Sequence, residues 1–124
     1  MQTFTKAERL CSKVIIDEVF AKGRTVTGPL FKLIWLESKE KQEYPLQVVI
    51  TVPKRNFKKA VDRNKLKRRI REAYRKNKAG VYAKTGSKSY GLILIYTGRT
   101  IVEYGEIEEK IIKLLERFTT EINK

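Results

Sequence analysis

Thirteen Lys and Arg residues lie between Lys54 and Lys78, and only two acids, Asp62 and Glu72, oppose them. This segment therefore carries +11 of the formal net charge of +14. A surface so rich in cations attracts phosphate groups through long-range electrostatics and the release of counterions. The segment predicts a polyanionic partner, which is either a nucleic acid or an anionic lipid surface.

The centre of this segment has the pattern of an amphipathic helix at about residues 60–77. Its apolar residues have the spacing i, i+4, i+7, i+8, which packs against a sheet: Leu66, Ile70, Ala73 and Tyr74. A separate stripe of cations repeats every four residues: Arg63, Lys67, Arg71 and Arg75. Cations four residues apart lie about 6 Å apart along a helix, so the stripe can meet successive phosphates. The planar forks of arginine suit phosphate oxygens, and a folded RNA with closely spaced phosphates is the favoured ligand.

Three alternative roles for the basic helix are less well supported by the sequence. A solvated surface would be better served by mixed signs, since like charges at i, i+4 repel by a few tenths of a kcal/mol. A membrane-surface helix would need the apolar face that the core requires. A DNA reader would need base-edge side chains on the exposed face. We therefore expect neither a membrane nor a DNA partner.

The composition argues against self-contained hydrolytic catalysis. The chain has no histidine, and Cys11, its one cysteine, is expected to be buried in an apolar helix face. Asp62 and Glu72 are ten residues apart, or about 15 Å along a helix, which is too far to share a water or a metal. Glu72 is instead expected to pair with Arg68, Arg75 or Lys76. We predict no catalytic and no metal-binding residue on this chain.

A length of 124 residues with 41% apolar content predicts one globular domain over residues 1–124. The first six residues lack the apolar stretch of a secretory signal, and no apolar run approaches the roughly 20 residues that span a bilayer. We expect a soluble, cytoplasmic protein.

The first half of the chain predicts one helix and two strands. Apolar residues recur at three- and four-residue spacing from Glu8 to Lys22, and Gly23 stands where a helix commonly ends. Two runs of strand-forming residues follow at 30–36 and 46–52. Because they are neighbours in the sequence, we expect them to form an antiparallel hairpin.

The second half predicts a loop, a strand and a helix after the basic helix. Residues 79–88 contain Gly80 and Gly86 and have loop composition, and the near-continuous apolar run at 90–96 is typical of a sheet centre covered by helices on both faces. Thr100 and Glu103 have the spacing of a capping box before an apolar helical stripe. The order α-β-β-α-β-α predicts an α/β fold with helices layered on a small mixed sheet.

Residues 60–74 read A-V-D-R-N-K-L-K-R-R-I-R-E-A-Y. They closely resemble the signature A-V-x-R-N-R-x-K-R-x-x-R-E of the protein component of bacterial ribonuclease P. Further matches stand upstream in the same order and spacing: Glu8-Arg9-Leu10, the turn at 19–23, Phe31 and Val52-Pro53-Lys54-Arg55. The resemblance covers essentially the whole chain.

The resemblance implies a compact α-β sandwich related to a ribosomal-protein domain, with a left-handed β-α-β crossover. It also implies an accessory subunit, a monomer within a ribonucleoprotein. The catalytic RNA of that particle, with Mg²⁺ bound mainly by the RNA, removes the 5′ leader of precursor tRNA. Two rival functions stay open at this point. One is a non-enzymatic RNA-binding or ribosome-associated protein, and the other is a protein-only nuclease, for which the chain lacks suitable residues.

The resemblance implies two sets of binding residues. Those expected to contact the catalytic RNA are Arg63, Asn64, Lys65, Lys67, Arg68 and Arg71. Those expected at the precursor leader, in a cleft between the first helix and the sheet, are Phe20, Phe31, Leu33, Val48, Ile50, Lys54 and Arg55. The chain departs from the family where Ile16 replaces a common aromatic, where Lys58-Lys59 replaces Gly-Asn, and where Lys65 replaces the second arginine of the signature. Because isoleucine has no ring on which a base can stack, we expect stacking of leader bases at Phe20 rather than at Ile16.

Overall fold

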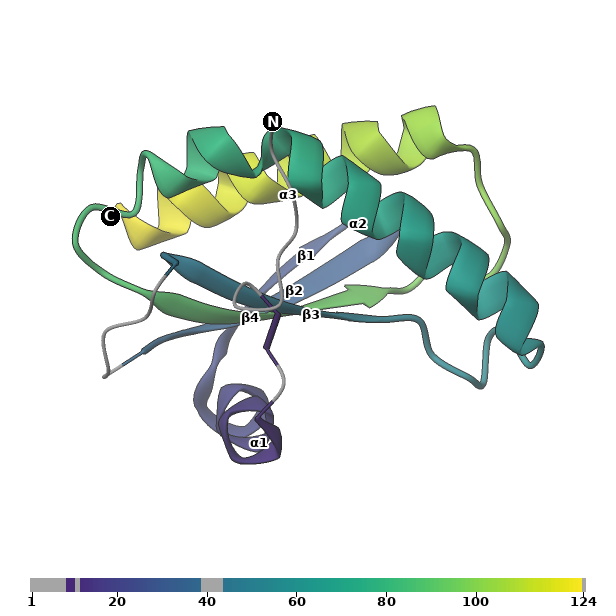
Figure 1. Ribbon diagram of the computed structural model, residues 1–124, viewed down its shortest axis with the longest axis horizontal. Coiled ribbons are helices and arrows are strands. Elements are labelled where there is room, and N and C mark those ends of the chain that lie inside the picture. Colours follow the sequence, from purple (N-terminus) through teal and green to yellow (C-terminus); the bar gives the residue numbers. More distant parts are fainter. Residues whose placement is uncertain (1–8, 11, 39–43, 124) are drawn as a thin grey trace.

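The computed structural model describes residues 9, 10, 12–38 and 44–123. In this part of the chain, seven elements follow one another (Figure 1): α1 Lys13–Lys22, β1 Arg24–Gly28, β2 Phe31–Glu37, β3 Leu46–Thr51, α2 Ala60–Tyr82, β4 Tyr90–Tyr96 and α3 Tyr104–Ile122. The predicted α/β class is confirmed. Glu8 and Cys11, which belong to the predicted first helix, lie outside the described residues.

The four strands found in the described residues form one mixed sheet in the order β1-β2-β4-β3. β4 pairs antiparallel with β2 and parallel with β3. The predicted hairpin between residues 30–36 and 46–52 is therefore wrong, because β4 lies between these strands. Because β4 lies at the centre of the sheet and is apolar on both faces, it can be buried from both sides.

The hairpin of the sheet is instead β1–β2, and β1 is a strand that the predicted order omitted. Only one of its side chains, Val26, is buried, so its apolar signal is weak. The tight turn at Pro29 and Leu30 closes it, and Leu30 has a φ of 65°, the left-handed conformation that such a turn requires.

The connection from β3 through α2 to β4 has the unusual left-handed sense. In Figure 1 the chain runs rightward along β3, returns leftward through α2 above the sheet, and runs rightward again in β4, which lies behind β3. This path turns counterclockwise as it moves away from the viewer, which defines a left-handed crossover. Most parallel connections turn the other way.

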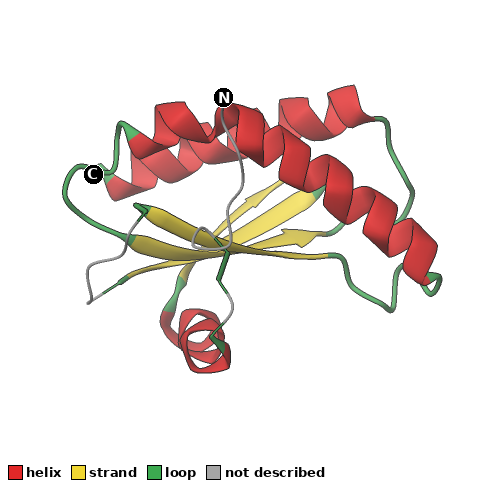
Figure 2. Ribbon diagram, viewed as in Figure 1, coloured by secondary structure: helices red, strands yellow, loops and turns green. Residues whose placement is uncertain are grey.

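Helices cover both faces of the sheet, as predicted (Figure 2). α2 and α3 pack side by side on one face, and α1 lies on the other. The predicted apolar face of α2 is confirmed, since Leu66, Ile70, Ala73 and Tyr74 are at most 1% exposed. Together with the inward face of the strands and the apolar stripe of α3, these residues form the main core.

Three boundaries differ from the prediction. α1 begins at Lys13, because Ser12 caps it and Arg9 and Leu10 lie along β3 instead, with the Leu10 amide donating to the Val48 carbonyl at 3.0 Å. α2 continues to Tyr82 through part of the predicted loop, since Val81 is buried in the core. At α3 the predicted capping box is absent, because Glu103 is itself the N-cap and makes no side-chain cap hydrogen bond.

None of the helices in the described residues has both the length and the apolar composition that a membrane span requires.

Candidate nucleic-acid interface

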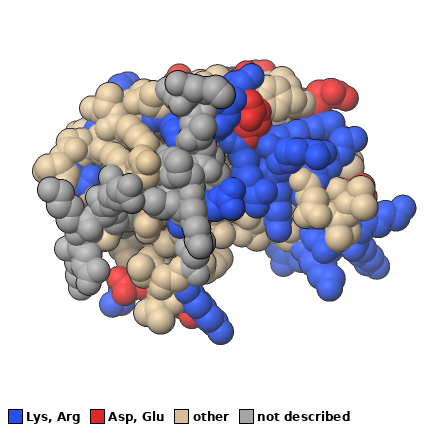
Figure 3. Space-filling view, in the orientation of Figure 1, with Lys and Arg blue, Asp and Glu red and all other residues tan. Residues whose placement is uncertain are grey.

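Helix α2 presents the basic segment on the molecular surface. Its apolar face is sealed against the sheet and α3, so its cations reach the surface at least in part, except Lys78, which is buried. Lys and Arg side chains gather over this helix and the loop before it (Figure 3). Lys58 and Lys59, which replace Gly-Asn of the family pattern, are exposed where this loop enters the helix.

Three arginines of α2 are engaged within the protein. Arg63 donates from Nη1 to the carbonyls of Phe57 at 2.7 Å and Lys58 at 2.9 Å. Arg69 donates from Nη1 to the carbonyl of Val102 at 2.6 Å, so it joins α2 to the segment before α3. The third, Arg75, forms an ion pair with Glu72. Arg63 and Arg69 thus attach the helix to neighbouring segments, whereas the Arg75–Glu72 pair lies within the helix.

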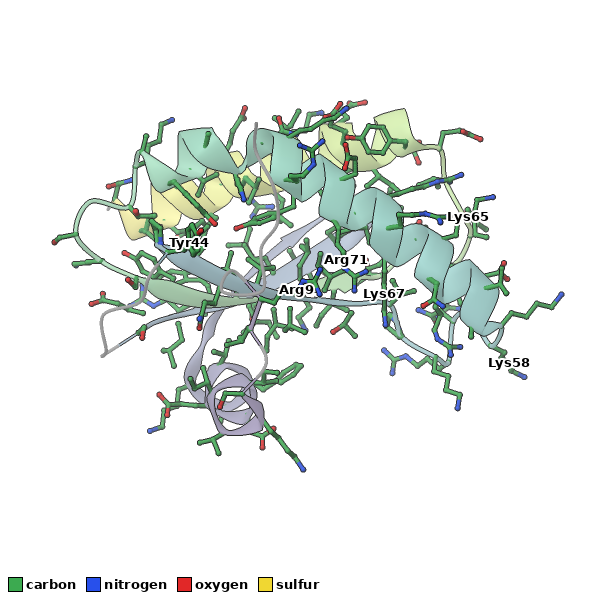
Figure 4. All side chains as sticks on the ribbon, viewed as in Figure 1. Arg9, Tyr44, Lys58, Lys65, Lys67 and Arg71 are labelled. Carbon is green, nitrogen blue, oxygen red and sulfur yellow. The ribbon has the colours of Figure 1, made fainter. Side chains whose placement is uncertain are left out.

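The remaining predicted RNA-binding residues of α2 point their polar groups to solvent. Asn64, Lys65, Arg68 and Arg71 are exposed and Lys67 is partly exposed. No hydrogen bond or ion pair within the described part of the chain engages the four cations of this group. In Figure 4, Lys65 lies on the upper side of α2, whereas Lys67 and Arg71 extend toward the edge of β3. The structure thus brings five of the six predicted residues to one open surface and gives Arg63 an internal role as well.

Glu72 is the acid inside this basic surface, and its predicted pairing is confirmed. It accepts from Arg75 and lies 3.9 Å from the Lys76 ammonium. The hydrogen bond from Arg75 is the main cause that lowers the pKa of the Glu72 carboxyl. Because Glu72 is engaged by Arg75 and Lys76, its charge offsets those two cations rather than Arg68 or Arg71.

The structure corrects the predicted wall of the leader cleft. The four strand residues chosen for it are 0 to 9% exposed and belong to the core beneath α2 and α3: Phe31, Leu33, Val48 and Ile50. Their side chains therefore face away from α1. Neighbouring residues of a strand point to opposite faces of the sheet, so a shift of one residue reverses the assignment. In β2 it is the even-numbered residues that face α1.

The sheet face beside α1 is only partly covered. Val19, Ile34 and Ile93 form a small buried cluster there, with Ile16 packed against it. Side chains on this face that stay partly exposed are Lys32, Val49, Thr51 and Ile95. Phe20 on α1 is 52% exposed. We use the name α1 groove for this partly exposed face of the sheet together with Phe20 on the adjacent helix.

Basic residues stand at the far end of the α1 groove. Lys54 and Arg55, both predicted, are exposed just after β3. A surface pocket at this end is lined by Pro53, Arg55, Asn56, Ile95, Tyr96, Thr97 and Arg99. Arg99 and Ile95 were not among the predicted residues. The alternation of faces along residues 90–96 would have placed Ile95 on the face opposite to the main core. No local sequence signal places Arg99 beside Arg55.

The described residues contain no group of three or more His, Cys, Asp or Glu that could hold a metal ion. The open surface of α2 carries ammonium and guanidinium groups, which repel cations. In the part of the chain that the structure describes, these residues do not fit a Mg²⁺ site.

The fold and the surface of α2 define a class of protein: a small α/β protein whose crossover helix exposes many Lys and Arg side chains. The family model described as Ribonuclease P matches residues 4–119. The ribonuclease P protein component of Porphyromonas gingivalis is 40% identical over 75 residues, which are 60% of this chain and 54% of that protein. That of Thermotoga maritima is 28% identical over 121 residues, 94% of this chain and 96% of that protein.

The chain belongs to the ribonuclease P protein family. With the first of these relatives the match spans only about half of the relative's length. The solved ribonuclease P protein of T. maritima shares 28% identity and superposes with a TM-score of 0.70 over 89% of this chain and 96% of that one. The Staphylococcus aureus RNase P protein, at 24% identity, has the same fold, with a TM-score of 0.74 over 91% and 96% of the two chains.

Proposed function

We propose that this chain is the protein subunit of a ribonuclease P particle. It binds the catalytic RNA through α2 and the 5′ leader of precursor tRNA through the α1 groove, and so supports Mg²⁺-dependent removal of the leader. The observation that carries the proposal is the family signature itself, displayed as exposed cations on a rigid crossover helix. In this proposal the protein acts as a monomer in the cytoplasm.

Each part of the proposal has a physical basis. Exposed Lys and Arg on one helix suit the closely spaced phosphates of a folded RNA, and such contacts position the protein without reading sequence. The α1 groove combines an exposed aromatic with flanking cations, which is the combination that binds single-stranded nucleic acid. The sequence has no histidine, and residues 9, 10, 12–38 and 44–123 hold no cluster of acids or cysteine that could bind a metal, so we assign cleavage and its Mg²⁺ ions to the RNA.

The test is a cleavage assay with precursor tRNA, Mg²⁺ and the full chain, with and without the ribonuclease P RNA of the same genome. We expect no cleavage by the chain alone and a higher kcat/KM when the chain is added to the RNA. Cleavage without the RNA would overturn the assignment of catalysis. Absence of any stimulation would favour a general RNA-binding protein instead.

A second assay separates the two surfaces. The assembled particle is titrated with precursor tRNA and with mature tRNA that lacks a leader. If the α1 groove holds the leader, adding the protein to the RNA tightens binding of the precursor more than binding of mature tRNA. Equal gains for both would remove the leader from the proposal and leave the α2 interface in place.

A further inference from the structure

Arg9 lies on the free edge of the sheet, far in sequence from α2. It forms an isolated parallel bridge with Val48 of β3, and the next residue, Leu10, donates its amide to the Val48 carbonyl at 3.0 Å. The Leu10 side chain is 3% exposed and lies near Gly91 on the α1 side of the sheet. Because side chains alternate along an extended segment, Arg9 points to the opposite side, which is the side of α2.

The rotation of α2 about its axis can be read from its contacts with α3 and with the segment before α3. Arg69 reaches Val102, and the Lys76 ammonium lies 5.5 Å from the centre of the Tyr104 ring. At 100° per residue, Lys67 and Arg71 lie on the flank opposite to these contacts. Since β3 is the edge strand beneath α2, that flank lies on the side of the sheet edge formed by β3.

Three cations from two distant segments therefore share this edge, and we call Arg9, Lys67 and Arg71 the edge cluster. Figure 4 shows the side chains of Lys67 and Arg71 extending from α2 toward the position of Arg9. Both α2 acids, Asp62 and Glu72, lie on other sides of the helix. Arg9 is an exposed residue beside this edge strand.

We propose that Arg9 is a further contact to the phosphate backbone of the catalytic RNA, and that it extends the α2 interface across the edge of β3. This inference rests on the proposed function. We choose the catalytic RNA over the leader as the partner because of the side of the sheet on which Arg9 lies. Arg9 faces the α2 side with Lys67 and Arg71, whereas the groove proposed for the leader lies on the α1 side. Arginine is suited to this position because its planar fork can bind two phosphate oxygens at once.

The experiment measures binding of the full chain to the ribonuclease P RNA over a series of salt concentrations. Arg9→Gln is compared with the wild type and with Lys113→Gln, a matched loss of one charge on the exposed side of α3. We expect Arg9→Gln to weaken binding roughly tenfold and to reduce the slope of log K against log salt by about 0.9. Lys113→Gln is expected to change neither quantity.

Equal affinity and slope for Arg9→Gln and Lys113→Gln would overturn the inference while leaving the proposed function intact. Failure of the wild type to bind the RNA would instead refute the proposed function. Weaker binding of precursor tRNA by the assembled particle, with normal assembly, would place Arg9 at the leader and also overturn the inference. If Arg9→Gln does not fold, a photo-crosslinker at position 9 is used, and crosslinks that miss the catalytic RNA decide against the inference.

Discussion

Arg63 and Arg68 lie five residues apart in α2 but have different environments. Arg68 is exposed and has no partner in the described part of the chain, whereas Arg63 donates to two loop carbonyls. We expect Arg68→Ala to weaken binding of the catalytic RNA roughly tenfold without lowering the thermal unfolding temperature. Activity of the particle should then depend more steeply on Mg²⁺. Titration and calorimetry measure these effects, and Lys113→Ala should behave as the wild type.

Arg63→Ala should act through the fold as well as through RNA binding. Removing the guanidinium leaves the carbonyls of Phe57 and Lys58 without this donor, so we expect a loss of about 1 kcal/mol in the free energy of unfolding. RNA binding should weaken too, because the loop with Lys58 and Lys59 loses its attachment to α2. Denaturant unfolding of Arg63→Ala beside Arg68→Ala checks this, and identical unfolding midpoints would contradict the structural role.

At the scale of elements, Gly23 sets how α1 joins the sheet. A Cβ at this position would lie 2.9 Å from the Trp35 carbonyl oxygen and 2.8 Å from Cγ2 of Ile34. Gly23→Ala should therefore destabilise the protein by about 1 to 3 kcal/mol, since the backbone at the start of β1 has to move. Gly80→Ala is the control, because nothing lies within 4 Å of its added Cβ and alanine favours a helix by up to about 1 kcal/mol. Equal stability of the two variants would show that the backbone around position 23 can make room for a Cβ without an energetic cost.

The α1 groove gives a second prediction at this scale. Phe20→Ala should weaken binding of precursor tRNA to the assembled particle by about 1 to 3 kcal/mol, the range for loss of one base-stacking platform. Binding of leaderless tRNA should not change. Val14→Ala removes a comparably exposed apolar side chain from another side of α1 and serves as the control. Similar effects of both variants on the precursor would argue against stacking at Phe20.

At the scale of the whole molecule, a net charge of +14 predicts an interaction that depends strongly on salt. If the four free cations of α2 each meet a phosphate, log K for the catalytic RNA should fall with log salt at a slope of roughly −3 to −4. Filter binding between low and high salt measures this slope. A flat dependence would contradict the electrostatic interface, because surface charges without phosphate partners release no counterions.

The packing of the molecule holds the charges of the crossover helix close together. The apolar residues of this helix at 66, 70, 73 and 74 anchor it over the sheet, so the like charges on its other sides cannot move apart. Such repulsion is relieved when an anion binds. The fold therefore holds these cations close together even when no anion is bound.

The sequence alone determined the apolar face of α2, the concentration of charge on that helix, the central place of β4 and the resemblance to a family. These features follow from local periodicity and composition, which need no knowledge of the neighbouring elements. The tertiary structure decided which cations face solvent, because Arg63 and Arg69 find backbone partners outside the helix that no spacing rule reveals. It also decided that Phe31 and Val48 lie in the core and that Arg9 joins the edge of β3. Periodicity tells which residues share a face, but only the packing of distant segments determines what covers that face.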